Sequence, residues 1–194
     1  MITVLTNTWE TYELPLCESG IVELDMGCGK GAYTLALAER YPERLVLGSD
    51  VMMGRLRRLD RKMEKRRLAN AHCLRAASLE LVSFQLPPKC VDRIHLLCPD
   101  PWPKDRHTVK RLVTNDFLCR IPRILKVGGI LHMSTDHAPY FEDWLRMVGH
   151  IELFELAPGA ADDMADIKTD FEKIWLEQGK AVQHVCWRLT RDWA

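Results

Sequence analysis

The segment "ELDMGCGKGA", residues 23–32, passes from a strand pattern to a helix pattern within a few residues. The surrounding "GIVELDMG" is typical of a buried strand, and "GAYTLALAERY" has the apolar spacing of a helix that packs on it. Gly27, Gly29 and Gly31 at the junction allow the backbone to turn tightly and to approach a ligand closely. The segment therefore predicts a strand–loop–helix unit with a ligand at its loop.

The rest of the chain repeats this alternation. Strands are expected at 20–27, 44–50, 71–76, 92–98 and 130–136, after 151 and at 182–190. Helices are expected at 31–41, 53–68, 78–85, 114–125 and 138–150. Strands that alternate with helices imply parallel crossover units, and so predict a doubly wound, mostly parallel, seven-stranded α/β sheet. We expect one domain over residues 1–194, with a short lead-in at 1–20 and a ligand-side loop at 157–175.

Composition narrows the class of protein. The 194 residues include 27 basic and 27 acidic residues, so net charge gives no sign of a nucleic-acid partner. No apolar run reaches membrane-spanning length, and the first residues lack the pattern of a secretion signal. The seven cysteines are scattered without a CxxC pair, which argues against structural zinc and against a secreted disulfide framework. We expect reduced thiols in a cytoplasmic protein.

Acidic residues beside the glycine loop favour one cofactor over another. In doubly wound sheets, ligands bind beyond the carboxyl ends of the strands. Asp50 ends the next strand, 19 residues after Gly31, where a ribose-binding acid is expected. Read as G-x-G-x-x-A ending at Ala32, the loop also fits a dinucleotide. Glu23 and Asp25 would repel a pyrophosphate, whereas S-adenosylmethionine carries two positive centres and no phosphate. We therefore place S-adenosylmethionine ahead of a dinucleotide.

A second unusual segment, "CPDPWPKDRH" at residues 98–107, follows the strand "RIHLL". Proline fixes its own φ and favours an extended conformation in the residue before it. Three prolines therefore predict a stiff, non-helical shelf that holds Asp100 and Trp102. Trp102 either stacks on a base or packs beneath the shelf. Because the shelf and the glycine loop both follow strands, we expect them at the same edge of the sheet.

Two groups of basic residues interrupt the neutral composition. Residues 55–67, "RLRRLDRKMEKRR", contain eight basic and two acidic residues. Four more basic residues follow the shelf: Lys104, Arg106, Lys110 and Arg111. Basic groups near one site suit a polyanion such as RNA, although a solvated helix face explains the first group equally well.

With loop and shelf both in view, the chain from about residue 21 resembles the bacterial tRNA (guanine-N7-)-methyltransferase family. The segment "CPDPWPKDRH" followed by "KR" resembles the family's Phe-Pro-Asp-Pro-Trp signature, and "MSTD" and "TDFE" match two further motifs. The resemblance implies a Rossmann-like class I methyltransferase fold with an antiparallel last strand. It also implies S-adenosylmethionine as cofactor, and a guanine N7 atom in the variable loop of tRNA as target. For the assembly we expect a monomer or a homodimer, with no metal and no membrane.

The resemblance also implies roles for individual residues. Asp100 falls on the proposed catalytic aspartate. The cofactor set comprises Glu23, Asp25, Gly27, Gly29, Gly31, Asp50, Ala77 and Asp100. The substrate set comprises Lys104, Asp136, Thr169, Asp170, Phe171 and Glu172. The RNA-contacting set comprises Arg106, His107, Lys110 and Arg111.

Some of these positions depart from the family pattern or have a second explanation. Ala77 stands where the family usually has an aspartate near the adenine, so backbone groups are expected to recognise that ring. Asp170 replaces a lysine. Thr169 and Glu172 also have the spacing of a helix capping box, which is compatible with substrate contact. His132 and His137 flank "MSTD" without a third convergent ligand, so we expect no metal site there.

The chemistry of guanine N7 suits this set of residues. The N7 atom is an acceptor lone pair with no proton to remove, so methyl transfer needs positioning and charge stabilisation rather than a strong base. Three other hypotheses remain at this point. They are an inactive RNA-binding relative, a methyltransferase acting on another RNA or a small molecule, and a nicotinamide-dependent oxidoreductase.

Overall fold

The computed structural model describes residues 2–5, 11–102 and 109–192. Its strands are β1 (Ile2–Val4), β2 (Val22–Met26), β3 (Leu45–Asp50), β4 (Ala71–Arg75), β5 (Val91–Leu97), β6 (Leu125–Thr135), β7 (Phe154–Leu156) and β8 (Gln183–Leu189). Its α-helices are α1 (Ala32–Arg40), α2 (Met53–Arg66), α3 (Ser78–Glu80), α4 (Asn115–Ile124), α5 (Ala138–Gly149) and α6 (Asp170–Glu177). A π-helix, η1 (Leu81–Gln85), continues α3, and a 3₁₀ turn, η3 (Asp162–Met164), precedes α6.

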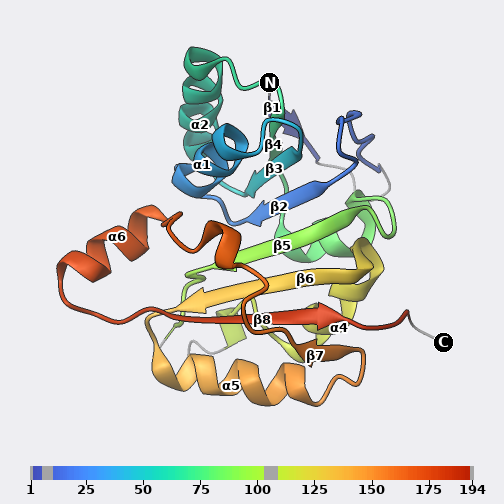
Figure 1. Cartoon of the computed structure of the whole chain (residues 1–194), viewed down its shortest axis with the longest axis vertical. Helices are drawn as coiled ribbons and strands as arrows, with labels where there is room; N and C mark the ends of the chain where they lie inside the picture. Colours follow the sequence, from blue (N-terminus) through green and yellow to red (C-terminus); the bar gives the residue numbers. More distant parts are fainter. Residues whose placement is uncertain (1, 6–10, 103–108, 193–194) are drawn as a thin grey trace.

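The described strands form one sheet in the order β1-β4-β3-β2-β5-β6-β8-β7 (Figure 1). Neighbours pair in parallel from β1 to β6, while β8 is antiparallel to both β6 and β7. The predicted doubly wound, mostly parallel sheet with an antiparallel last strand is therefore confirmed. The strand order reverses between β2 and β5, and the carboxyl ends of these two strands carry the glycine loop and the proline shelf.

The predicted number of strands was too low by one. Ile2 pairs with Cys73 and Val4 with Arg75, so β1 extends the sheet beyond β4. The sequence predicts no strand in the lead-in at 1–20, because a three-residue strand gives no alternation long enough to recognise. It is formed because the outer edge of β4 offers unpaired backbone groups that a parallel neighbour satisfies.

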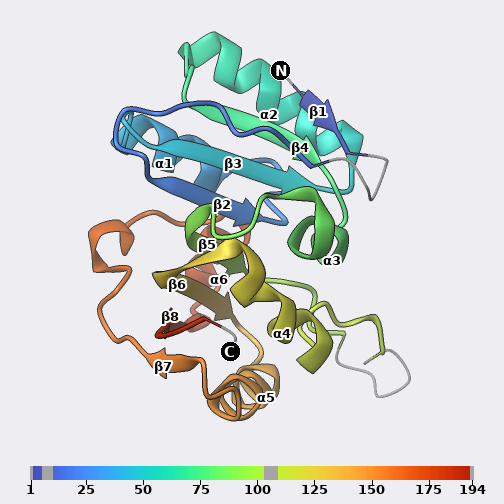
Figure 2. The same ribbon diagram turned by 90° about the vertical axis from the view of Figure 1, so that its right-hand side faces the viewer.

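Two apolar layers cover the sheet. On one face, α1 and α2 bury side chains such as Leu37, Leu56 and Leu59, together with Met164 and Ile167 from the segment before α6. On the other face, η1, α4 and α5 pack over the alternate strand residues. Figure 2 shows α1 to one side of the sheet and α3 and α4 to the other. Because side chains alternate along a strand, residues one position apart belong to different layers.

Two local features differ from the expectation. The paired glycines of "KVGG", residues 126–129, follow the helix expected at 114–125 and have the composition of a helix end, but α4 ends at Ile124 and β6 begins at Leu125, so they lie inside a strand. A Cβ on Gly129 would lie 2.8 Å from the Lys126 carbonyl oxygen and 2.9 Å from that of Asp92, and the β5–β6 register shifts beside it. The helix α6 was not expected as an element. Within the described residues, no helix is long and apolar enough to span a membrane.

Candidate active site

The glycine loop joins β2 to α1 with the backbone conformations that its glycines permit. Gly27, Gly29 and Gly31 have φ values of 75°, 58° and 78°, in the left-handed region that side-chain-bearing residues avoid. A Cβ on Gly31 would lie 2.3 Å from Cδ1 of Leu59, so the loop packs directly on α2. A Cβ on Gly27 would meet no atom within 4 Å, because this part of the loop faces open space. The loop is thus anchored at one end and open to a ligand at the other.

Asp25 places a buried carboxyl group at the base of the loop. Its side chain is 3% exposed, and Oδ2 accepts a 2.6 Å hydrogen bond from Oγ1 of Thr34 on α1. Burial raises the pKa of Asp25 to about 6, and the Thr34 hydrogen bond and the charge of His95 offset that rise only in part. Among the described residues no basic side chain forms an ion pair with Asp25, so this buried acid is a favourable neighbour for a cation, and S-adenosylmethionine carries two positive centres.

Asp50, at the end of β3, closes the other side of the loop. Its Oδ1 accepts the backbone N–H of Met52 at 2.7 Å, and its Oδ2 accepts that of Gly29 at 3.1 Å. Arg55 lies 3.4 Å from the same Oδ2. The carboxylate therefore fixes the glycine loop as well as facing the pocket. The predicted ribose contact stays a prediction, and any variant of Asp50 will also disturb the loop.

Glu23 does not occupy the place that the sequence predicted for it. Its carboxylate is fully buried; Oε1 accepts from Arg44 at 2.7 Å, and Oε2 lies 2.9 Å from Nε2 of His95. Burial alone would raise the pKa of Glu23, but the hydrogen bond and charge of His95, followed by Arg93 and Arg44, lower it. Asp25, two residues nearer the carboxyl end of the same strand, lines the pocket instead. We therefore revise the expectation and assign Glu23 to the core.

The proline shelf is also shaped differently from the expectation. Cys98 and Trp102 each precede a proline, yet their φ values are 54° and 40° rather than extended. The backbone N–H of Cys98 donates to the Ser134 carbonyl at 2.8 Å, which fixes the start of the shelf on β6. Positive φ at two non-glycine residues is strained, and such strain persists only where surrounding contacts impose it. The turn brings Asp100 and Trp102 to the wall of the pocket.

The two basic residues after the shelf have different surroundings. Nε of Arg111 donates to the Pro101 carbonyl at 2.8 Å, Nη1 pairs with Asp143 at 3.2 Å, and the guanidinium lies over the Tyr140 ring. Arg111 therefore holds the shelf, and its expected contact with RNA stays a prediction. Lys110 is exposed, with its ammonium 4.8 Å from the centre of the Trp102 ring. Lys104, Arg106 and His107 lie outside the described residues.

The late motif forms the start of α6. Oγ1 of Thr169 accepts the Glu172 N–H at 3.0 Å, as a capping residue does. Thr169, Asp170 and Phe171 line the pocket, whereas the Glu172 carboxylate turns away to Lys168 at 2.8 Å and His184 at 3.0 Å. The expected substrate contact of Glu172 is therefore replaced by a contact with its own protein.

Two further predicted residues lie at the margin of the site. Asp136 follows β6 and lies 4.0 Å from Nζ of Lys180 rather than at the pocket wall. At the end of β4 the wall is formed by Ser78, next to Ala77. Ala77 precedes α3 with an extended backbone and is not itself among the residues that line the pocket.

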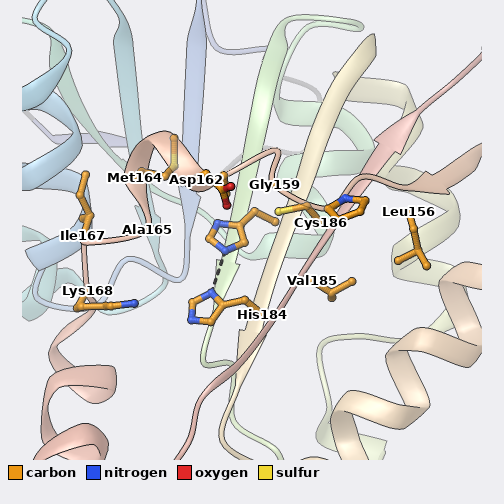
Figure 3. A pocket seen from close by; sticks show the side chains of 13 residues that line it. Leu156, Gly159, Asp162, Met164, Ala165, Ile167, Lys168, His184, Val185 and Cys186 are labelled. Carbon is orange, nitrogen blue, oxygen red and sulfur yellow. Dashed lines mark hydrogen bonds between the residues drawn. The ribbon is translucent and has the colours of Figure 1, made fainter.

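These elements enclose a pocket of about 370 Å³. It is lined by the glycine loop, Asp25, Asp50, Ser78, the shelf from Cys98 to Trp102, Lys110 and the first turns of α6. A larger cavity of about 490 Å³ lies elsewhere, between β8 and the segment before α6 (Figure 3). We assign the cofactor to the smaller pocket because the loop, the acids and the shelf converge there. The larger cavity is lined mainly by apolar groups. Residues within 158–168 of the expected ligand-side loop border it, but none of the individually predicted site residues does.

The donor set of this pocket fits S-adenosylmethionine. A buried carboxyl group, a second carboxylate at a strand end and an open glycine backbone can hold an ammonium group, a ribose and a close-lying chain. Within the described residues, no group of three or more His, Cys, Asp or Glu side chains is arranged to hold a metal ion. Fold and pocket together define a class I methyltransferase that uses S-adenosylmethionine.

Comparison with known protein sequences identifies the family. Residues 19–185 match the family model described as "Putative methyltransferase". The tRNA (guanine-N(7)-)-methyltransferase of Caulobacter vibrioides is 32% identical over 161 residues, 83% of this chain and 70% of that protein. The enzyme of that name from Nitrosospira multiformis is 32% identical over 168 residues, 85% and 73% of the two chains. The chain belongs to the tRNA (guanine-N7-)-methyltransferase family.

Solved structures agree on the fold. The 16S rRNA methyltransferase KamB superimposes with a TM-score of 0.67 at 19% identity, over 90% of this chain and 91% of that one. A SAM-dependent methyltransferase from Aquifex aeolicus gives a TM-score of 0.62 at 15% identity, over 88% and 83%. At these identities the likeness concerns the fold alone.

Sequence reasoning missed residues that act through others. Thr34 orients Asp25, and nothing in "GAYTLALAERY" marks it as polar support. His132 does have histidine neighbours, His95 and His184, but they come from β5 and β8. A signal existed, since "RIHLL" and "ILHMS" each place one histidine among apolar strand residues. His137 instead caps α5 by accepting the Tyr140 N–H.

Proposed function

We propose that this protein methylates the N7 atom of a guanine in the variable loop of tRNA. The observation that carries the proposal is the convergence, in one pocket, of a cofactor-type loop with the Asp100 shelf and the first turn of α6. The cofactor side explains why a methyl donor binds. The shelf side supplies a carboxylate and an aromatic ring where a purine would have to enter.

The chain's own residues account for the chemistry in the following way. When bound, S-adenosylmethionine supplies a methyl group activated by its sulfonium. Asp25 faces the cationic cofactor, and Asp50 and the glycine backbone orient it. The guanine N7 lone pair would form the new bond to the methyl carbon while the bond from that carbon to sulfur breaks, which leaves a neutral thioether. No proton is removed, so a positive charge develops on the purine. Asp100 offsets that charge, and Trp102 offers a face for base stacking.

The basic surface supports an RNA substrate. Lys110 lines the pocket and is exposed, and α2 carries exposed basic side chains, among them Arg57, Arg58 and Lys65. Charges of this kind bind phosphates without reading sequence. A cytoplasmic location belongs to the same proposal, since all seven cysteines are free thiols.

The test is methyl transfer to an unmodified tRNA transcript, followed by nucleoside analysis. We expect 7-methylguanosine from the variable loop and none from a transcript whose variable-loop guanine is replaced. Asp100→Asn should lower turnover by about 10²-fold or more, the scale of a lost electrostatic contact in a transition state, while adenosylhomocysteine still binds. Methyl transfer to a different base would refute the target. A turnover that falls only as far as cofactor affinity falls would refute the role of Asp100.

A further inference from the structure

Five side chains on the α1 side of the sheet form one hydrogen-bonded sequence, here called the histidine row: Glu23, His95, His132, His184 and Glu172. Between successive members the joined atoms lie 2.9, 3.2, 3.0 and 3.0 Å apart. The row crosses β2, β5, β6 and β8 and ends on α6. His95 is fully buried, His132 is 5% exposed, and the side chain of His184 is 33% exposed. Both nitrogens of every imidazole take part.

The two ends of the row are carboxylates. Arg44 donates to Glu23 at 2.7 Å, and Lys168 pairs with Glu172 at 2.8 Å. Burial alone would raise the pKa of Glu172, but hydrogen bonds from His184 and Lys168 lower it below its ordinary value, and the pKa of Glu23 is lowered as well. Both ends are therefore ionised at neutral pH and can only accept protons in hydrogen bonds.

The hydrogen bonds of the histidine row require a fixed number of protons. The four contacts need one proton each, and the carboxylates supply none. A neutral imidazole carries one ring proton, so three neutral histidines supply three. Tyr33 Oη lies 3.3 Å from Nδ1 of His95, but its hydroxyl donates to Sδ of Met164 at 3.0 Å and supplies no proton to the row. A row in which all four contacts are hydrogen bonds therefore requires a fourth proton, which makes one of its rings an imidazolium.

The position of the extra proton follows from the centre of the row. Burial, followed by the charges of His95 and His184, holds the pKa of His132 well below its ordinary range, so this ring is neutral. If His132 donates from Nε2, His95 must carry both protons and faces Glu23. If His132 donates from Nδ1, His184 carries both and faces Glu172. The tautomer of His132 thus decides which ring carries the positive charge: His95 in the core, or His184 beside α6.

Loss of the fourth proton breaks the row at its outer end. With three protons, His95 can still donate to Glu23, His132 to His95, and His184 to His132. The Nε2 atom of His184 then presents a lone pair to the Glu172 carboxylate, and that contact becomes repulsive. The break falls there because His184 is the most exposed ring, where water can replace the lost bond. Figure 3 shows His184 and Lys168 beside the larger cavity.

The helix α6 depends on this contact to an unusual degree. Of its eight residues, all described, Glu172 alone is buried. Phe171 and Ile174 are 53% and 48% exposed, so apolar packing does little to fix the helix. Figure 1 shows α6 standing off the sheet. Its first turn nevertheless forms part of the pocket wall, so a displacement of α6 would change the shape of the pocket directly.

We propose that the histidine row holds one proton beyond those of three neutral imidazoles, and that this proton positions α6 by keeping His184 a donor to Glu172. The effect on catalysis rests on the proposed function; the proton count does not. His184 and Glu172 are positioning residues in this account. Further ionisable groups face the row from neighbouring elements: Asp25, Tyr33, Arg44, Arg93, Asp162, Asp163, Lys168 and Cys186.

The first experiment is ¹⁵N NMR of the imidazoles in the full-length protein, titrated from acid to alkaline pH without substrate. At pH 7 we expect one ring-equivalent of imidazolium shared by His95 and His184, with His132 neutral. His150, exposed at the end of α5, serves as the internal reference. Three neutral rings at pH 7 would overturn the proposal. This measurement needs no variant and no enzymatic activity.

The second experiment uses Glu172→Gln. A glutamine amide can donate to the Nε2 lone pair of His184, so the variant completes the row with three protons and no charge. We expect its imidazolium signal to disappear at pH 7. In the wild-type protein, loss of the extra proton at alkaline pH should lower the hydrogen-exchange protection of α6 amides by about 10- to 100-fold, the scale of one charged hydrogen bond. The variant should lack that pH dependence. The same dependence in both proteins would overturn the positioning role.

The third experiment concerns turnover. If α6 contributes to the substrate site, the KM for tRNA should rise in wild type over the same pH range in which the row loses its proton, and in Glu172→Gln it should not. His150→Gln provides a control that changes a histidine outside the row. An absence of methyl transfer in every protein, with the NMR result intact, would refute the proposed function and leave the proton count standing. A KM that follows pH equally in Glu172→Gln would refute the link to α6.

Discussion

Asp25→Asn should make the protein more stable and its cofactor affinity weaker, and these opposite effects follow from one buried charge. The pKa of Asp25 is about 6, against an ordinary value of 3.8, because burial disfavours the carboxylate. A difference of about two pH units corresponds to about 3 kcal/mol. The side chain is 3% exposed, so solvent screening reduces this figure little. An asparagine carbonyl can still accept the Thr34 hydroxyl, so the variant keeps the hydrogen bond and loses the charge.

The sign of the stability effect depends on pH. Because the pKa of Asp25 is raised in the folded state, the protonated side chain costs the folded protein nothing below about pH 4. As pH rises to about 6 the carboxyl group must ionise in a buried place, and the free energy of unfolding falls. We therefore expect Asp25→Asn and wild type to have similar unfolding free energies at pH 4. Above pH 6 the ligand-free variant should be more stable by up to about 3 kcal/mol. Urea denaturation at several pH values measures this difference directly.

The affinity effect has the other sign. A hydrogen bond to a charged group contributes about 1.5–3 kcal/mol, so Asp25→Asn should weaken adenosylhomocysteine binding by about 10- to 100-fold at pH 7.5. Wild-type affinity should fall as pH drops below 6, while the variant's affinity should not. Calorimetry gives both values, and Asp116→Asn, which removes an exposed acid from α4, is the control. A variant that is less stable at pH 7.5 and binds the cofactor as wild type does would refute the reasoning.

Three further predictions test the site from other sides. Glu23→Gln breaks a buried ion pair with Arg44 and should lower the unfolding free energy by about 3–5 kcal/mol. Calorimetry on the folded variant should find cofactor affinity unchanged, and a large loss of affinity would return Glu23 to the cofactor site. Arg111→Ala removes the hydrogen bond to Pro101 and should lower both thermal stability and methyl transfer. Lys110→Ala should reduce the log–log salt slope of tRNA binding by about 0.7–0.9 and leave thermal stability unchanged. Equal behaviour of the two variants would contradict the different roles given to these residues. Gly31→Ala places a Cβ 2.3 Å from Leu59 at a φ of 78° and should lower the free energy of unfolding by about 1–3 kcal/mol. The control Gly54→Ala, whose Cβ would meet nothing within 4 Å, should leave stability unchanged or raise it. Equal melting temperatures of the two variants would show that the glycine loop rearranges to accept the extra carbon.

The sequence by itself determined the architecture and the location of the site. Strand and helix periods alternate clearly enough to predict the parallel sheet, and ligand sites in such sheets lie beyond the carboxyl ends of strands. The glycines needed for positive φ, the proline-rich shelf and the capping threonine are local features, and local features can be read from neighbouring residues. The segments that they mark do converge on one pocket.

Tertiary structure decided which side chains face that pocket. Glu23 and Asp25 share one face of β2 and differ by only about 7 Å along the strand, so alternation cannot separate them. Packing separates them, because Arg44 and His95 cover Glu23, whereas the open end of the loop leaves Asp25 at the pocket wall. The positive φ of Cys98 and Trp102 likewise opposes the local preference of residues before proline, because distant contacts from Ser134 and Arg111 impose it.

The histidine row shows the same division most fully. Each of its histidines is the one histidine of its strand, and no spacing in the sequence connects them. They meet because the register pairs His95 with His132 and because β8 enters antiparallel beside β6, which sets His184 next to His132. Contacts between residues 37 and 52 positions apart are decided by strand order and register, which only the folded sheet supplies.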